Sequence, residues 1–108
     1  MSNFTTYMSH VGTAPDKFFK STLFHSQRLL LGLNSLEPGQ AQKVHSHTGQ
    51  DKFYFVLEGE GEFVVGDETR RCKSGHAIWA PADVPHGVSN HGSERLVVLV
   101  GIAPSPGG

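Results

Sequence analysis

Residues 39–47 read GQAQKVHSH, and the rest of the chain is arranged around them. The stretch holds two histidines, His45 and His47, separated by one residue, and it runs on toward a glycine at Gly59. Side chains of a β-strand alternate between its faces, so two histidines at this spacing on a strand point the same way. Imidazole is the commonest protein ligand for transition metals, and such a pair would form one arm of a metal clamp.

A third histidine lies far along the chain, in the segment 81–90, which reads PADVPHGVSN. His86 is preceded by Pro85, whose ring fixes the backbone at that point. We expect strands at 42–47 and 86–90. If the fold places them side by side, the three imidazoles meet inside one end of a barrel and leave positions for water or substrate.

Composition limits the functions that the chain can have. With 108 residues it fits one domain, and Lys plus Arg (9) against Asp plus Glu (10) leave a net charge of -1. No basic field is present to attract nucleic acid or a membrane surface, so we expect neither as a partner. The single cysteine, Cys72, has no intrachain disulfide partner, and we find no signal peptide or apolar run long enough to span a bilayer. We therefore expect a cytoplasmic protein.

Turn signals recur at short intervals after Gly39 and predict an all-β fold. They separate seven or more short strands, which favours a closed or sandwiched antiparallel architecture. We expect an N-terminal arm over 1–16, a barrel over 17–103 and a flexible tail over 104–108. Residues 17–24 fit a short helix or a strand equally well. The other expected strands cover residues 28–36, 42–47, 52–58, 62–65, 69–72, 76–80, 86–90 and 96–102.

These residues resemble the two sequence motifs of the cupin superfamily. The first is Gly39-x5-His45-x-His47 followed by a strand ending at Gly59, and the second is Gly75-x5-Pro81-x-Asp83-x2-His86-x3-Asn90. The resemblance covers about half of the chain and implies a double-stranded β-helix, that is, a jelly-roll barrel, usually paired into homodimers. It also implies a divalent transition metal inside one end, such as iron, manganese, nickel or zinc. Asp83 stands where the second motif usually has glycine, and aspartate also suits turns.

Lys52 is the main departure from the family pattern, because a metal-binding glutamate is expected seven positions before the closing glycine. In one interpretation Lys52 bends outward, and Asp51 or Gln50 reaches the metal instead. In a second the site has three histidines, with Lys52 paired to Asp51. In a third Lys52 points inward with a lowered pKa and acts as a catalytic general base or a carbonyl-reactive amine. A site without metal is a further alternative.

Two functional hypotheses follow from these residues. The first is a metal-binding cupin whose interior, lined by Tyr54 and Val56 on the strand face of Lys52, accepts a small organic molecule for oxygenase, isomerase or lyase chemistry. The second is a binding or sensing module without turnover, in which Lys52 and the histidines hold a small anion such as a carboxylate. The metal-ligand candidates of the first hypothesis are His45, His47 and His86, with Asp51 as an additional one.

Overall fold

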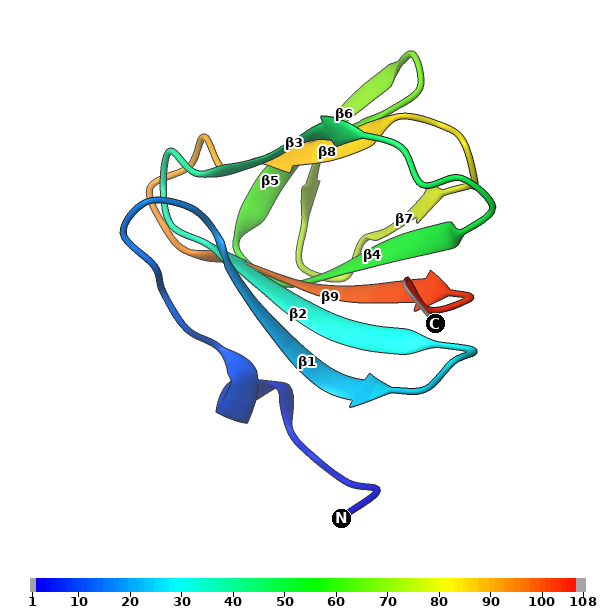
Figure 1. Cartoon of the computed structure of the whole chain (residues 1–108). Helices are drawn as coiled ribbons and strands as arrows, with labels where there is room; N and C mark the ends of the chain where they lie inside the picture. The colour runs from blue at the N-terminus through cyan, green and yellow to red at the C-terminus, as the bar shows by residue number, and fades with distance from the viewer. Residues whose placement is uncertain (1, 107–108) are drawn as a thin grey trace.

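The protein folds into two antiparallel β-sheets that face each other across a single interior (Figure 1). The computed structural model describes residues 2–106. The five-stranded sheet has the order β1-β2-β9-β4-β7 and the four-stranded sheet the order β3-β8-β5-β6. The strands are β1 (Phe19–His25), β2 (Leu30–Leu36), β3 (Ala41–His45), β4 (Asp51–Glu58), β5 (Glu60–Val65), β6 (Glu68–Lys73), β7 (Ala77–Ala80), β8 (His86–Ser89) and β9 (Leu96–Ala103), preceded by a 3-10 helix η1 (Tyr7–His10).

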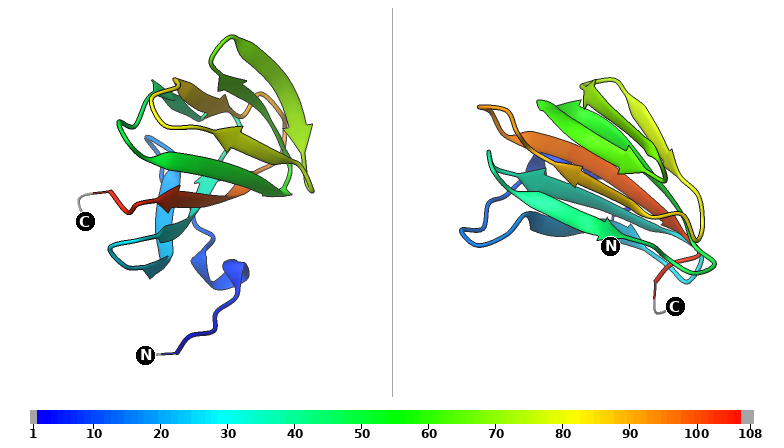
Figure 2. Two further views of the ribbon diagram at one scale, coloured as in Figure 1. Left: turned by 90° about the vertical axis from the view of Figure 1, so that its right-hand side faces the viewer. Right: turned by 90° about the horizontal axis from the view of Figure 1, so that it is seen from above.

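This arrangement confirms the predicted all-β jelly roll. From β2 onward the chain passes repeatedly from one sheet to the other, and Figure 2 shows the two layers from two further directions. Residues 17–24, which fit either element type, contribute β1, an edge strand paired with β2. The described part of the chain, 2–106, contains no α-helix, and no helix in it is long and apolar enough to cross a membrane.

Alternation along the strands builds the core between the sheets. In β4 the side chains of Lys52, Tyr54 and Val56 are buried, whereas Phe53 lies on the opposite face and is partly exposed. This is the period-two pattern expected of a strand with one face inward. The apolar core cluster combines residues of both sheets: Leu36, Tyr54, Val56, Phe63, Cys72, Val88, Leu96, Val98, Val100 and Ile102.

The pairing of β3 with β8 places the two histidine-bearing segments side by side. Ala41 lies opposite Ser89, and His45 lies opposite His86, with a register irregularity between Gln42 and His45. Directly opposed residues of an antiparallel pair have side chains in contact. The strand pairing therefore brings the two sequence motifs together at one end of the sheet.

Two residues of the second motif fix the loops around this pairing. The side-chain amide of Asn90 is buried and donates to the carbonyls of Leu36 and Glu94, both at 2.9 Å. Asp83 adopts a left-handed conformation with φ of 68°, and its N–H donates to the carbonyl of His47 at 3.0 Å. A left-handed residue other than glycine is most often Asn or Asp, which explains why aspartate serves at this position.

The N-terminal arm is held against the barrel. It lies on the outer side of the five-stranded sheet near β1 (Figure 1), where the Tyr7 hydroxyl donates to Glu58 at 2.8 Å and the His10 ring bonds the Ser21 hydroxyl at 3.0 Å. The predicted tail is anchored where it begins, since Ser105 is 4% exposed and its N–H donates to the Gln27 carbonyl at 3.2 Å. Residues 107 and 108 of that predicted tail lie outside the described residues.

Candidate metal centre

His45, His47 and His86 meet at one end of the barrel. His45 ends β3, His86 begins β8, and His47 lies in the loop after β3. One ligand nitrogen from each ring lies within 4.8 Å of the other two. The ring centroid of His45 lies 4.8 Å from that of His47 and 4.6 Å from that of His86, so the imidazoles converge on a common space.

His47 lies in a loop and not on the strand that was predicted for it. We expected both histidines of the first motif on one strand, but β3 ends at His45, and His47 belongs to the following loop. The Asp83 N–H, from the loop before β8, holds the His47 carbonyl. The two motifs thus position this ligand together.

Backbone hydrogen bonds orient two of the three rings. The Nδ1 atom of His45 donates to the Lys43 carbonyl at 2.7 Å, and that of His86 donates to the Val84 carbonyl at 3.0 Å. A carbonyl oxygen only accepts, so the proton sits on Nδ1 in both rings and each Nε2 keeps its lone pair. Such an outer contact fixes the tautomer and orientation of metal-binding histidines.

The nitrogen geometry fits a transition metal. The Nε2 atoms of His45 and His47 are 3.1 Å apart, whereas two nitrogens bound at about 2.0–2.1 Å and at tetrahedral or right angles are about 2.9–3.4 Å apart. The Nε2 atom of His86 is fully buried and has no hydrogen-bond partner in the described part of the chain. Buried polar atoms are nearly always satisfied, so an unpaired acceptor in a cluster of imidazoles indicates a position for a cation.

Burial favours the neutral, metal-binding form of two of these rings, His47 and His86. Burial is the largest cause that lowers the pKa of His86 to about 4, although the hydrogen bond to Val84 opposes it. Burial also lowers the pKa of His47, with Lys52 as the next contributor. Metal ligation requires the unprotonated ring.

Lys52 points inward, so the interpretation in which it bends outward is wrong. Its side chain is 2% exposed, and its ammonium lies 3.5 Å from the Gln42 amide oxygen and 4.7 Å from the centroid of the Tyr54 ring. Burial, followed by the charge of Lys20, lowers the pKa of Lys52 to about 8. The structure therefore places a cation where the family pattern has an acidic ligand.

Asp51 and Gln50, the alternative oxygen ligands, lie outside the histidine cluster. The Asp51 carboxylate is exposed and accepts a hydrogen bond from the Ala82 N–H at 3.0 Å, and it does not belong to the histidine cluster. The Gln50 amide donates to the Pro104 carbonyl at 3.2 Å. Neither side chain joins the three imidazoles, and no ion pair between Lys52 and Asp51 is found within residues 2–106.

Tyr54 and Val56, the predicted cavity residues, are packed in the core. Both are 0% exposed. The Tyr54 hydroxyl donates to Gln42, and burial raises the pKa of Tyr54. A cavity of about 280 Å³ opens instead between the edge strands β6 and β7, and it is lined by Phe63, Val65, Glu68, Arg70, Cys72, His76, Ala77, Ile78 and Trp79.

Gln42 and Lys20 are site residues that the sequence pattern did not reveal. On a regular strand Gln42 and His45 would face opposite ways, but the register irregularity between them turns both inward. Lys20 lies on β1, the segment that the pattern left unassigned, and its charge lowers the pKa of both Lys52 and His47. A bulge carries no simple sequence signal.

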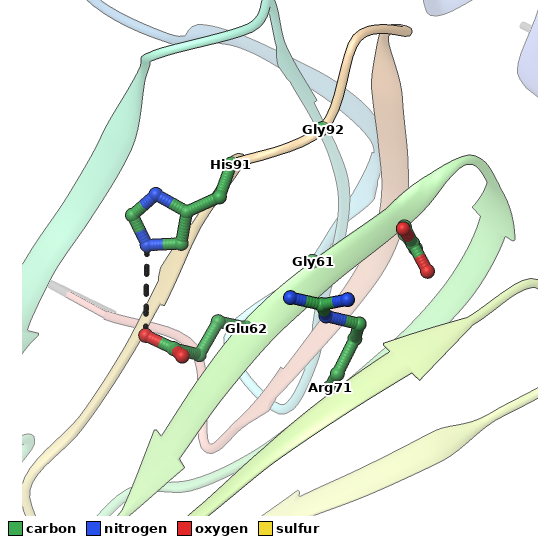
Figure 3. A pocket seen from close by; sticks show the side chains of 6 residues that line it. Gly61, Glu62, Arg71, His91 and Gly92 are labelled. Atoms are coloured by element: carbon green, nitrogen blue, oxygen red, sulfur yellow. Dashed lines mark ion pairs between the residues drawn. The ribbon is translucent and has the colours of Figure 1, made fainter.

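The other histidines lie outside the cluster. His91 lies at the opposite end of β8, beside a cavity of about 60 Å³ that Glu62 and Arg71 also line (Figure 3). Its Nε2 is 3.5 Å from a Glu62 carboxylate oxygen, and both side chains are largely exposed. An exposed pair of this kind contributes little to stability.

A two-sheet antiparallel barrel with three histidines gathered inside one end defines the cupin class of protein. The model of the Cupin domain family matches residues 32–102, and the chain belongs to this family. A crystal structure of a protein from Thermus thermophilus is 42% identical, with a TM-score of 0.94 over 97% of this chain and 100% of that one.

Other relatives differ in what their names state. An uncharacterised protein of Streptomyces coelicolor is 36% identical over 72% of this chain and 72% of its own length. An oxalate-binding protein of Thermotoga maritima is 28% identical over 69% of this chain and 62% of its own length. A crystal structure of a predicted oxalate decarboxylase from the same organism has a TM-score of 0.74 at 25% identity, covering 78% of this chain and 77% of that one.

Proposed function

We propose that this cupin binds a divalent transition metal through His45, His47 and His86 and accepts a small organic ligand beside it. The observation that carries the proposal is the buried, unpaired Nε2 of His86 among the two other imidazoles. Iron, nickel and zinc suit imidazole ligands, whereas manganese favours sites richer in oxygen ligands. A bound metal of this kind acts as a Lewis acid on carbonyl or carboxylate oxygens.

Other residues of the site orient the metal ligands and can act on the bound molecule. Hydrogen bonds to Lys43 and Val84 aim the rings of His45 and His86. The inward Lys52, with its pKa lowered to about 8, suits the role of a catalytic general base or carbonyl-reactive amine on the ligand. The reaction, among oxygenase, isomerase and lyase chemistry, is not assigned by these residues, because one fold hosts many functions.

Metal content tests the proposal directly. Protein purified without a histidine tag is compared with a variant that carries His45→Ala and His47→Ala, using elemental analysis. We expect a near-stoichiometric transition metal in the wild type and a large loss in the variant. An equal and negligible metal content in both proteins, each shown to be folded, would contradict the proposal.

A second candidate function is a small-anion binding module without turnover. The observation that favours it is Lys52, a buried cation with no carboxylate beside it among the described residues. The oxalate-binding relative from Thermotoga maritima is consistent with a carboxylate ligand. Thermal-shift measurements on metal-stripped protein discriminate the two, since a ligand that binds only the folded state raises its stability. Stabilisation by organic anions alone favours this module, and stabilisation only by divalent metals favours the first proposal.

We also propose a homodimer located in the cytoplasm. The outer face of the five-stranded sheet exposes Phe53 and Trp79, which lie directly opposite each other on β4 and β7. Exposed aromatic pairs of this kind are typical of interfaces. The single cysteine, Cys72, is a buried free thiol, in keeping with a reducing compartment.

A further inference from the structure

Among the residues that the structure describes, the buried cation Lys52 has no negative partner. Its only described polar contact is the neutral amide oxygen of Gln42 at 3.5 Å, and its other close neighbour is the face of the Tyr54 ring. The two ion pairs found within residues 2–106 join His91 to Glu62 and Arg95 to Glu58, far from this position. A buried charge is costly unless it is paired, and none of the described residues supplies a counter-ion for this ammonium.

The same position is close to the histidine cluster, because the Tyr54 ring that the Lys52 ammonium faces at 4.7 Å has its centroid 6.1 Å from that of His86. The charge of Lys52 contributes to lowering the pKa of both His47 and His86, as expected of a cation that acts on the metal-binding space. The nearest acidic neighbour in sequence, Asp51, is engaged by the Ala82 N–H on the exposed side of the strand. A divalent metal at the histidines would add positive charge near the ammonium, and no carboxylate among residues 2–106 joins the cluster to offset either charge.

We propose that the site binds a metal and a small carboxylate as a pair, with the carboxylate supplying the negative charge that the described residues of the site lack and accepting a hydrogen bond from Lys52. This inference rests on the proposed metal-binding function and deepens it. A carboxylate has two oxygens, so one can face the metal while the other faces the ammonium. Each ligand then raises the affinity of the other by the same factor, as thermodynamic linkage requires.

A charge argument distinguishes this arrangement from two independent sites. Without the anion, metal binding at the histidines is opposed by Lys52, and without the metal, the anion meets only one cation. Lys52→Glu places a carboxylate inside the site and should make metal binding tight and independent of added anion. Lys52→Gln removes the charge without adding one and should weaken the coupling.

The experiment measures the affinity of the untagged, metal-free wild-type protein for Co²⁺ by isothermal titration calorimetry, with and without acetate. Acetate is chosen because it chelates free metal weakly, and each titration is corrected for metal–acetate binding in the buffer. We expect acetate to raise the Co²⁺ affinity of the wild type at least about fivefold, the lower end of typical coupling. The matched control is Lys73→Gln, which removes an exposed lysine on β6, outside the histidine cluster, and should keep the coupling.

The possible results distinguish a failure of the proposed metal–carboxylate coupling from a failure of the proposed metal binding. An affinity for Co²⁺ that acetate leaves unchanged in the wild type, or a coupling that survives intact in Lys52→Gln, would overturn the inference while metal binding stands. Absence of Co²⁺ binding both with and without acetate would overturn the proposed function itself. Far-ultraviolet circular dichroism establishes that each variant is folded, and if Lys52→Glu fails to fold, the Lys52→Gln comparison still decides.

Discussion

At the scale of single residues, Lys52 sets the chemistry of the site because its charge is buried among neutral partners. The pKa of Lys52 is lowered from 10.5 to about 8, so the folded state favours the neutral amine more than the unfolded chain does. Below pH 8 both states are protonated, and folding carries the full cost of burying the charge. Between pH 8 and 10.5 the unfolded state still holds the proton that the folded state has released, so this residue makes stability rise with pH.

We predict that Lys52→Met stabilises the metal-free protein at pH 7, because the substitution removes the cost of burying the charge. Replacing an unpaired buried charge with an apolar side chain of similar length should raise the free energy of unfolding by about 1–4 kcal/mol. The gain should shrink as the pH rises from 8 to 10.5, by on the order of 3 kcal/mol for a pKa change of this size. Urea denaturation across this pH range measures both effects. Lys73→Met, at an exposed position on β6, should show neither, and a pH-independent gain in Lys52→Met would contradict the argument.

At the scale of elements, the turn after β4 places a strict demand on one residue. Gly59 has φ of 76°, and a β-carbon built there would collide with the Arg95 carbonyl. Gly75 has φ of 95°, but a β-carbon there would meet no atom within 4 Å. The two glycines share the left-handed backbone and differ in the space around them.

This difference predicts unequal costs for the same substitution. Gly75→Ala should lower the free energy of unfolding by about 1–2 kcal/mol, the cost of a left-handed alanine. Gly59→Ala should cost clearly more, because the backbone of the loop before β9 must also move. Thermal and urea unfolding of the two variants under one set of conditions tests the comparison, and equal losses would mean that the loop moves freely.

A bound metal should also reduce local opening of the edge strand β3. β3 is an edge of the four-stranded sheet, and the three proposed ligands join it to β8 and to the following loop. We expect addition of Zn²⁺ to slow amide hydrogen exchange over 41–47, because ligation opposes local opening of that edge. The other edge strand, β6, serves as an internal control and should not change. The variant with His45→Ala and His47→Ala should lose the protection, and protection that persists there would place the metal elsewhere.

The elements also show where sequence reasoning succeeds and where it stops. Alternation correctly predicted that Lys52, Tyr54 and Val56 share one face of β4, because that rule depends on backbone geometry alone, but it left the inward direction of Lys52 open. It did not predict the inward turn of Gln42, since the irregularity in β3 depends on pairing with β8. Nor did it determine whether Tyr54 and Val56 line a cavity or fill the core, which packing between the two sheets decides.

At the scale of the whole molecule, apolar side chains remain exposed on the outside of the five-stranded sheet. Phe53 is 36% and Trp79 is 59% exposed, and the N-terminal arm on the same side of the barrel adds Phe4 and Met8 (Figure 1). The Phe53 ring lies over Gly101 of β9, where no side chain could fit beneath it. A flat aromatic surface built in this way suits contact with a second copy.

We therefore expect the protein to dimerise through this face. Light scattering during size-exclusion chromatography should give about twice the chain mass of 11.7 kDa for the wild type. The double variant Phe53→Ser and Trp79→Ser should shift toward the single-chain mass, because it removes the central apolar contacts of the interface. Val44→Ser, which changes an exposed apolar residue on β3 of the other sheet, should leave the dimer intact. A wild-type protein of single-chain mass, or a dimer that dissociates only with Val44→Ser, would show that the aromatic face is not the interface.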